Sequence, residues 1–419
     1  MSHIKKYAPR RRFEKFSNAD DWEQRKFEDC FNFPVSTNSL SRVMLNYDKG
    51  EVKNVHYGDV LIKYPCILNI KKEEIPYITG GCLEAYNSNL LENGDLIFAD
   101  AAEDETVGKA VEVNGITNEN LVSGLHTIVA RATKQKAKYF LGYYINSDIY
   151  HRQLLRLMQG SKVSAISKGN LQKTDVSFPK DIEEQQKIGS YFKKLDDTIT
   201  LHQRKLEKIK ALKTAYLSEM FPAEGETKPK RRFAGFTDDW EQRKLKDVAT
   251  FNPKSELPDE FEYVDLESVV GTELISHRNE SKKTAPSRAQ RLAKYGDVFY
   301  QTVRPYQKNN YLYNLSYNNY VFSTGYAQIR PKIDSYFVLN RVQEEKFVKL
   351  VLDRSTGTSY PAINSNDLSE IEIKVPVDSN EQIKIGQLFK YLDDTIALHQ
   401  RKLQKLQNIK KAYLNEMFI

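Results

Sequence analysis

The chain has 419 residues, of which 40% are hydrophobic and 28% charged, and this composition predicts a globular protein with about two domains. No run approaches the roughly 20 apolar residues of a membrane-spanning helix, so we expect no membrane contact. Three cysteines without CxxC spacing argue against a disulfide framework and a zinc ribbon, and predict a cytoplasmic protein. The net charge of +7 suits a polyanionic partner without establishing one.

Two kinds of segment occur twice along the chain. A short opening segment, RRFEKFSNADDWEQRKFEDC from Arg11, returns as RRFAGFTDDWEQRKLKDV from Arg231. Residues 192–221 and 389–418 match at a constant offset of 197, and 21 of their 30 paired positions are identical. Such repeats indicate a duplicated structural unit. We therefore expect a pseudo-two-fold internal repeat, in which each half has an opening segment, a variable region and a long helix.

The first variable region, within residues 1–180, predicts an α+β domain. Short apolar runs indicate strands at residues 60–62, 96–98 and 127–129, and residues 138–159 follow as a helix. Several basic and polar side chains are candidates for contact with DNA, although an ordinary surface role suits each of them equally well. They are Lys63, Tyr64, Lys109, Arg131, Lys162, Ser164 and Lys168.

A long helix is predicted at residues 181–221. Asp181 is the expected N-cap, and Glu184 follows three residues later as in a capping box. Apolar side chains then recur at alternating spacings of four and three, which is typical of a coiled coil. The seam consists of Ile188, Phe192, Leu195, Ile199, His202, Leu206 and Ile209. The helix would span roughly 50 Å, and Pro222 in the linker 222–232 would stop it.

The second variable region, residues 233–377, predicts another α+β domain, with strands at residues 298–300 and 326–329 and a helix at 335–354. Gly296-Asp297 before a strand resembles Gly94-Asp95 in the first half, and residues 357–368 align with 160–171. The loop after residue 300 carries amide, guanidinium and aromatic groups that suit base-edge readout, with Lys308 and Arg330 as phosphate contacts. The candidates are Gln301, Arg304, Tyr306, Lys308, Asn309, Asn310 and Arg330.

The second long helix, residues 378–419, repeats the first, with Asp378 as N-cap and Glu381 after it. Its seam consists of Ile385, Phe389, Leu392, Ile396, His399, Leu403 and Leu406. Two equal helices in one chain can bury their seams against each other, and pseudo-two-fold symmetry favours the antiparallel direction. His202 and His399 lie on the seams, so we expect them to pack there rather than to bind a metal.

The motifs of catalysis that we sought are not visible in the sequence. It lacks the (N/D)PP(Y/F) tetrapeptide of adenine methyltransferases, a Walker A sequence and an HExxH pair. We therefore assign no catalytic residue, metal ligand or cofactor to this chain. Asp259, Glu280 and Lys282 fit the loose PD…ExK pattern of metal-dependent nucleases, but the pattern arises easily by chance and has no counterpart in the first half.

The chain resembles the specificity (S) subunits of type I restriction-modification enzymes. The residues that carry the resemblance are the DDWEQRK openers, the LDDTI, LHQRKL, AYL and EMF blocks of the helices, the Gly-Asp motifs before strands, and STGYAQIRP at residues 323–331. The resemblance implies two α/β target-recognition domains separated by two long helices that pair as an antiparallel coiled coil. It places these domains at residues 1–180 and 233–377, and the helices at 181–221 and 378–419.

The resemblance also implies the partners. Each recognition domain would read one half of a bipartite target in double-stranded DNA, with half-sites roughly 34–36 Å apart. The helices would dock two modification (M) subunits, which carry S-adenosylmethionine and methylate adenine, and restriction (R) subunits would use ATP and Mg²⁺ for translocation and cleavage. Two alternatives remain open, a stand-alone repressor and a self-sufficient nuclease built on Asp259, Glu280 and Lys282.

Overall fold

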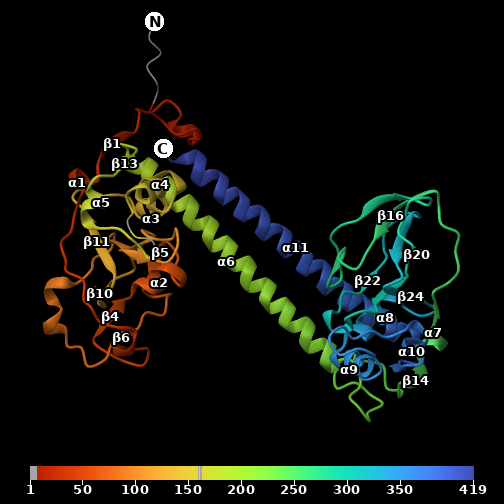
Figure 1. The fold of residues 1–419 in the computed structure, drawn as a ribbon. Helices are drawn as coiled ribbons and strands as arrows, with labels where there is room; N and C mark the ends of the chain where they lie inside the picture. Colours follow the sequence, from red (N-terminus) through yellow and green to blue (C-terminus); the bar gives the residue numbers. More distant parts are fainter. Residues whose placement is uncertain (1–6, 159, 161–162) are drawn as a thin grey trace, which may run out of the picture. The chain divides into compact units, whose positions relative to one another are not determined.

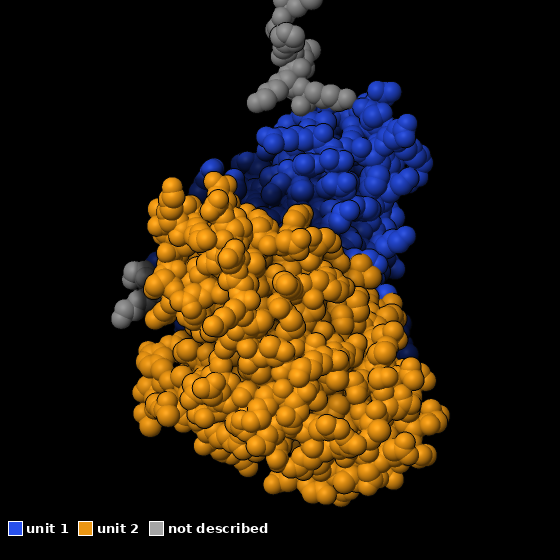
Figure 2. Space-filling view, turned by 90° about the vertical axis from the view of Figure 1, so that its right-hand side faces the viewer, with its two compact units in different colours: residues 1–202, 402–419 blue, residues 203–401 orange. Residues whose placement is uncertain are grey.

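The computed structural model describes residues 7–158, 160 and 163–419, which form two compact units (Figure 1 and Figure 2). Unit 1 joins the chain up to His202 to a second piece, Lys402–Ile419, whereas unit 2 is the single stretch Gln203–Arg401. The unit boundary therefore passes through the long helices. Within the described ranges, no helix is long and apolar enough to cross a lipid bilayer.

The repeated segments form the long helices α6 (Ile182–Glu219) and α11 (Ser379–Met417). Asp181 caps α6, because its Oδ1 accepts the backbone N–H of Glu183 at 2.8 Å. Asp378 caps α11 in the same way through the backbone N–H of Asn380, also at 2.8 Å. The N-caps thus lie where the sequence predicts them.

The predicted capping boxes are wrong, because the glutamates bind arginines of the opening segments instead. Glu184 is fully buried and accepts from Nε and Nη2 of Arg12, both at 2.6 Å. Glu381, equally buried, accepts from the same atoms of Arg232 at 2.6 and 2.8 Å. Bidentate pairs of this kind fix both partners in orientation. They anchor each opening segment to the start of the helix of its own half, which explains why both recur together.

The two helices run antiparallel in each unit, as the sequence predicts. In unit 1 the first part of α6 lies beside the last part of α11, where Lys410 Nζ is 2.5 Å from Asp196 Oδ1. In unit 2 the last part of α6 lies beside the first part of α11, where Lys213 Nζ is 2.5 Å from Asp393 Oδ1. These two ion pairs are equivalent under the offset of 197, so the pseudo-two-fold symmetry holds at the level of single contacts.

The core of each unit is completed by the end of the other half's helix. In unit 1 the ring of Phe418, which follows α11, lies 6.5 Å from Trp22 and 5.7 Å from Phe192. In unit 2 the ring of Phe221, which follows α6, lies 6.1 Å from Trp240. All five side chains are at most 3% exposed. The tryptophan of each opening segment therefore packs on a phenylalanine supplied by the other repeat.

Unit 1 contains a five-stranded sheet with the order β2-β11-β7-β9-β5 and a four-stranded sheet with the order β10-β4-β6-β3. Its strands are β1 (Glu23–Lys26), β2 (Phe31–Asn32), β3 (Leu45–Asn46), β4 (Val52–Val55), β5 (Ile67–Asn69), β6 (Tyr77–Ile78), β7 (Leu96–Ala99), β8 (Ala101–Ala102), β9 (Ala110–Asn114), β10 (Asn120–Ser123), β11 (Thr127–Ala132), β12 (Ser164–Ala165) and β13 (Asp175–Phe178). Its shorter helices are η1 (Glu14–Phe16), α1 (Phe27–Cys30), η2 (Arg42–Met44), α2 (Tyr57–Ile62), η3 (Leu83–Ala85), η4 (Asn87–Asn89), α3 (Phe140–Ile145), α4 (Asp148–Leu157) and α5 (Lys168–Gln172). The central strand β7 is buried throughout and pairs antiparallel with β9 and β11.

Unit 2 contains two four-stranded sheets, with the orders β15-β24-β21-β22 and β19-β16-β23-β20. Its strands are β14 (Glu241–Lys244), β15 (Ala249–Phe251), β16 (Glu260–Val264), β17 (Val269–Val270), β18 (Glu273–Leu274), β19 (Arg278–Ser281), β20 (Ala289–Leu292), β21 (Val298–Gln301), β22 (Tyr311–Leu312), β23 (Tyr320–Ser323), β24 (Tyr326–Pro331) and β25 (Glu372–Val375). Its shorter helices are α7 (Leu245–Val248), η5 (Pro305–Gln307), α8 (Ser335–Gln343), α9 (Glu345–Asp353) and α10 (Ser365–Ser369). The pair β21–β24 is the counterpart of β7–β11 in unit 1.

The strands predicted at residues 96–98, 127–129, 298–300 and 326–329 are confirmed as parts of β7, β11, β21 and β24. The strand predicted at residues 60–62 is wrong, because this segment ends helix α2. His56 caps that helix by accepting the backbone N–H of Gly58 at 3.2 Å. A local cap therefore outweighs the β-preference of the short apolar run.

The single helices predicted at residues 138–159 and 335–354 are each two helices. Ser147 separates α3 from α4, and its hydroxyl accepts the N–H of Tyr150 as an N-cap. Residue 159 lies outside the described residues. Glu344 separates α8 from α9, with an extended ψ of 142°. Its buried carboxylate pairs with Arg341, three residues earlier.

Candidate functional site

A buried aspartate–arginine pair joins the two central strands of each unit. Asp95, directly before β7, accepts from Nε and Nη2 of Arg131 on β11 at 2.6 and 2.7 Å. Asp297, directly before β21, accepts from the same atoms of Arg330 on β24 at 2.7 and 2.8 Å. Both aspartates are 1% exposed or less, and the hydrogen bond that Arg330 donates to Asp297 raises the pKa of Arg330. The repeated Gly-Asp motif is therefore part of the scaffold.

Each central strand ends at a corner of the unit, where three segments meet. In unit 1 the backbone N–H of Asp100 donates to His126 at 3.0 Å, and the carbonyl of Asp100 accepts from Ile166 at 2.8 Å. In unit 2 Thr302 makes the same two bonds, with Gly325 and Ile363, both at 3.0 Å. We call these regions the strand-end corners: residues 100, 124–126 and 163–166 in unit 1, and 302–308, 324–325 and 356–363 in unit 2.

Backbone strain is concentrated at the two corners. In the described part of the chain, the residues other than glycine with positive φ are His126, Tyr139, Asn252, Arg304 and Lys308. His126 lies in the corner of unit 1 at φ 52°, and Arg304 and Lys308 lie in the corner of unit 2 at 55° and 56°. Each such residue costs on the order of 1–3 kcal/mol, and strain of this kind clusters at functional sites.

The corner of unit 2 presents a guanidinium group on an aromatic platform. Arg304 lies over the ring of Tyr360 at 4.3 Å, and its backbone N–H donates to Pro361 at 2.7 Å. Among the described residues, Arg304 has no carboxylate partner. Tyr360 and Tyr306 are 61% and 49% exposed. An unpaired, stacked arginine beside exposed tyrosines is a donor group available to a ligand.

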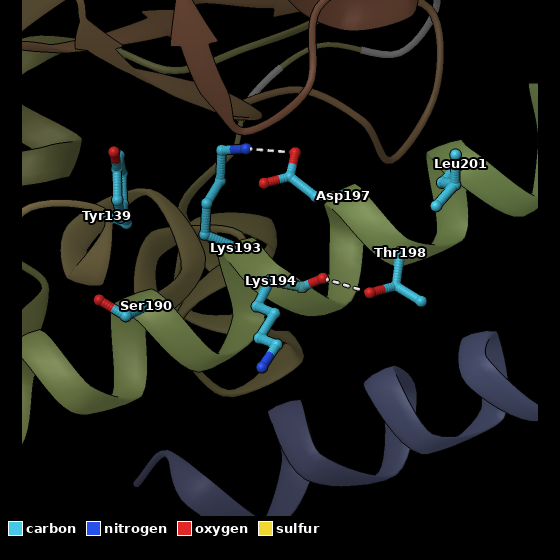
Figure 3. A pocket seen from close by; sticks show the side chains of 7 residues that line it. All are labelled: Tyr139, Ser190, Lys193, Lys194, Asp197, Thr198 and Leu201. Atoms are coloured by element: carbon cyan, nitrogen blue, oxygen red, sulfur yellow. Dashed lines mark hydrogen bonds and ion pairs between the residues drawn. The ribbon is translucent and has the colours of Figure 1, made fainter.

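A second kind of surface occurs on the long helices and is also repeated. In unit 1 a pocket of about 350 Å³ is lined by Tyr139 and by Ser190, Lys193, Lys194, Asp197, Thr198 and Leu201 of α6 (Figure 3). In unit 2 Tyr336, Lys390 and Asp394 line a larger pocket at the equivalent place. The lysine–aspartate pair measures 2.6 Å in both units. We call these two regions the helix flanks.

The comparison with protein families decides the identity. The model of the type I restriction modification DNA specificity domain matches residues 19–211 and 237–408, which together are most of the chain. The chain belongs to this family. It is a type I restriction-modification specificity subunit with DNA-recognition domains.

Two relatives of this specificity subunit are distant in sequence. The HindI specificity subunit of Haemophilus influenzae is 24% identical over 163 residues, 38% of this chain and 35% of its own length. A Methanocaldococcus jannaschii protein, provisionally named the MjaX specificity subunit, is 20% identical over 417 residues, 94% of this chain and 92% of its own length. The crystal structure of the S subunit of M. genitalium has the same fold, with a TM-score of 0.62, 14% identity and coverage of 98% of this chain and 99% of that one.

Most of the candidate residues of unit 1 lie away from its corner. Arg131 is occupied by Asp95. Tyr64 is 2% exposed, and its hydroxyl donates to a backbone carbonyl. Lys63 and Lys109 also donate to backbone carbonyls, at 2.7 and 2.8 Å, and burial lowers the pKa of Lys109.

The three remaining candidates of unit 1 differ in where they lie. Ser164 lies in the corner on β12, whose pairing with β8 brings it there. Lys168 is exposed and lies 5.4 Å above the ring of Phe33. Lys162 lies outside the described residues. Of the six candidates of unit 1 that the structure describes, it brings one, Ser164, to the corner.

Some candidates of unit 2 lie at the surface of the corner, whereas others are buried beneath it. Arg304, Tyr306 and Lys308 lie in the corner, where Lys308 pairs with Glu345. Gln301 and Asn310 are buried, and the backbone N–H of Gln301 donates to Asn310 Oδ1 at 2.9 Å. These two amides shape the loop from within.

Two further candidates of unit 2 are engaged elsewhere. Asn309 accepts the backbone N–H of Gly271 at 2.9 Å, and Arg330 is occupied by Asp297. The positions that sequence reasoning missed are Asp100, His126 and Tyr360. Asp100 is the residue after the apolar run 96–99, so the end of the strand is a signal that could have found it.

The residues of the nuclease pattern lie on neighbouring strand ends. The backbone N–H of Lys282 donates to the carbonyl of Asp259 at 2.8 Å, and Glu280 pairs with Arg278 at 2.7 Å. Within the described ranges, no group of three or more histidine, cysteine, aspartate or glutamate side chains could hold a metal ion.

The seam positions of the long helices differ in burial. Ile188, Phe192, Leu195, Ile199, Leu206, Ile385, Phe389, Leu392 and Leu403 are buried. Ile209, Ile396, Leu406, His202 and His399 are half-buried.

Proposed function

We propose that this specificity subunit reads a bipartite target in double-stranded DNA, one half-site for each unit. The observation that carries the proposal is the contrast between a repeated scaffold and divergent corners. The units share the anchoring pairs of the opening segments, the Asp–Arg pairs and the helix ends, whereas the corner of unit 1 presents Asp100 and His126 and that of unit 2 presents Arg304 and Tyr360. One framework with two different surfaces suits two different half-sites.

The contact residues that we propose are those displayed at the corners. In unit 2 they are Arg304, Tyr306 and Lys308, because arginine donates well to guanine and lysine to phosphate. In unit 1 the contact residue at the corner is Ser164, and the exposed Lys168, two residues beyond the corner, is a further candidate. Tyr64 is buried, and Arg131 and Arg330 are paired with buried aspartates, so these candidates belong to the scaffold.

We further propose that the helix flanks dock two M subunits. The flanks repeat with the same tyrosine, lysine and aspartate, and the exposed leucines Leu201 and Leu398 are equivalent under the offset of 197. A surface presented twice fits two copies of one partner. In this assembly the M subunits carry S-adenosylmethionine and methylate adenine, R subunits add ATP- and Mg²⁺-dependent cleavage, and the present chain supplies no catalytic residue.

The decisive experiment is to map adenine methylation across the genome of a strain with and without this chain. We expect one bipartite motif to be methylated only when the chain is present, and an M subunit to co-purify with it. The proposal would be contradicted if every motif stayed methylated without the chain, or if no methyltransferase co-purified with it. Cleavage of DNA by the chain alone with Mg²⁺, abolished in Asp259→Ala, would instead support a nuclease.

A further inference from the structure

The corner of unit 1 contains an aspartate and a histidine in direct contact. Asp100 Oδ1 lies 3.2 Å from His126 Nδ1, and the two side chains are 28% and 51% exposed. The backbone of Asp100 is fixed by its bonds to His126 and Ile166. The ring of Tyr57 meets the imidazole edge-on at 5.2 Å between centroids. Backbone hydrogen bonds and the ring of Tyr57 therefore fix the orientation of the pair, while part of each side chain stays exposed to solvent.

The strained backbone of His126 points to a role beyond packing. Its φ of 52° lies in the left-handed region, where a glycine would avoid the cost. The equivalent turn of unit 2 is only Thr324-Gly325, without an additional side chain. Unit 1 thus holds an imidazole, at an energetic cost, at a place where unit 2 holds none.

The outward atoms of the pair are hydrogen-bond acceptors. When the Nδ1 proton of the neutral ring points to Asp100, Nε2 carries a lone pair, and Oδ2 of the carboxylate is a second acceptor. Within the described part of the chain, neither Nε2 nor Oδ2 has a hydrogen-bond partner. The following turn adds the exposed acids Glu103, Asp104 and Glu105. This negative surface disfavours phosphate and favours a neutral donor.

We propose that Asp100 and His126 form a specificity-determining pair of unit 1, which accepts a hydrogen bond from the exocyclic amino group of a base. In the major groove that group is N4 of cytosine or N6 of adenine, whereas guanine O6 and N7 and thymine O4 are acceptors that the pair repels. The inference rests on the proposed function and deepens it. The corner of unit 1 selects a donor on the base, and Arg304 in unit 2 selects an acceptor.

The test uses the complex of this chain with its M subunit and a duplex that carries its methylation motif. In the half-site read by unit 1, each cytosine is replaced in turn by 2-pyrimidinone and each adenine by purine, which removes one amino group at a time. We expect one replacement to weaken binding roughly 10–100-fold, because one good base contact discriminates by about that factor. Whether the sensitive base is cytosine or adenine identifies the amino group.

The same duplexes are then bound by Asp100→Asn and by His126→Gln. We expect Asp100→Asn to bind the original and the sensitive analogue about equally, while its preference at the other half-site stays intact. Glu103→Gln removes the same charge from the same surface and should keep the full discrimination. An unchanged preference at the other half-site shows that unit 2 is intact, and unchanged thermal unfolding shows that unit 1 of each variant is folded.

The outcomes separate this inference from the proposed function. If removing any amino group from this half-site leaves binding by the natural chain unchanged, or if Asp100→Asn keeps the discrimination, the inference is overturned while bipartite recognition stands. If the natural complex binds no bipartite motif, both fail together.

Discussion

At the scale of single residues, each buried Asp–Arg pair links the start of one central strand to the strand beside it. Asp297 is fully buried and accepts two hydrogen bonds from Arg330, so the change to asparagine removes the charged partner of the guanidinium and one of its two acceptors. We expect Asp297→Asn to lower the free energy of unfolding by about 3–5 kcal/mol. Urea denaturation measures this loss. A matched change in an exposed ion pair, Glu370→Gln opposite Lys244, should leave stability almost unchanged.

A buried carboxylate makes the stability of unit 1 depend on pH. Glu112 accepts the backbone N–H groups of Tyr139 and Gly142 at 2.6 and 2.8 Å, and burial raises its pKa to about 7 from an ordinary 4.5. Between these values the folded state keeps a proton that the unfolded state has lost, so stability falls as pH rises from 4.5 to 7 and then levels off. The slope contributed is at most about 1.4 kcal/mol per pH unit.

Glu112→Gln should flatten this fall, although Glu344, whose burial also raises its pKa to about 7, leaves part of it in place. Denaturant unfolding at a series of pH values measures the slope. A slope between pH 4.5 and 7 equal to that of the natural chain would contradict the assignment to Glu112.

At the scale of elements, neighbouring leucines on the long helices separate pairing from docking. Leu206 and Leu403 are 7% and 8% exposed on the seam, whereas Leu201, which lines the flank of unit 1, and its equivalent Leu398 are 51% and 43% exposed. We expect Leu206→Glu with Leu403→Glu to destabilise the helix pair by several kcal/mol and to abolish M-subunit binding as well. Thermal unfolding and co-purification measure the two effects.

The exposed leucines provide the matched experiment. Leu201→Glu with Leu398→Glu should leave thermal unfolding unchanged and still weaken binding of the M subunits, since the change lies on the flank and away from the seam. Undiminished M-subunit binding by this variant would exclude the flanks as the docking surface.

The sequence predicts the elements whose signal is long or repeated. The four-three spacing locates α6 and α11, whereas the antiparallel direction of their pairing is only favoured by symmetry and rests on the family resemblance. Short signals are less reliable. At residues 60–62 the cap at His56 starts a helix in place of the predicted strand. At Glu344 an extended ψ of 142° divides the helix predicted at residues 335–354, and the apolar pattern does not reveal this break. The corner was unpredictable for a related reason, since Asp100 and His126 meet only through the pairing of β7 with β11.

At the scale of the whole molecule, the units are constructed from one pattern and differ at their corners. Exchange of residues 241–379 for the corresponding segment of another family member should therefore change one half of the methylation motif and leave the other half intact. Methylome sequencing of the hybrid strain reads both halves at once. A change in both half-sites would show that recognition is shared between the units.

The insertion of Phe418 into the core of unit 1 has a consequence for biosynthesis. The ribosome must add residues 203–401 after the rest of that core has been made. At about 5–20 residues per second, this takes roughly 10–40 s. During that interval Trp22 and Phe192 lack the aromatic neighbour that Phe418 supplies, so the core of unit 1 is completed only after residues 203–401 of unit 2 have been synthesised.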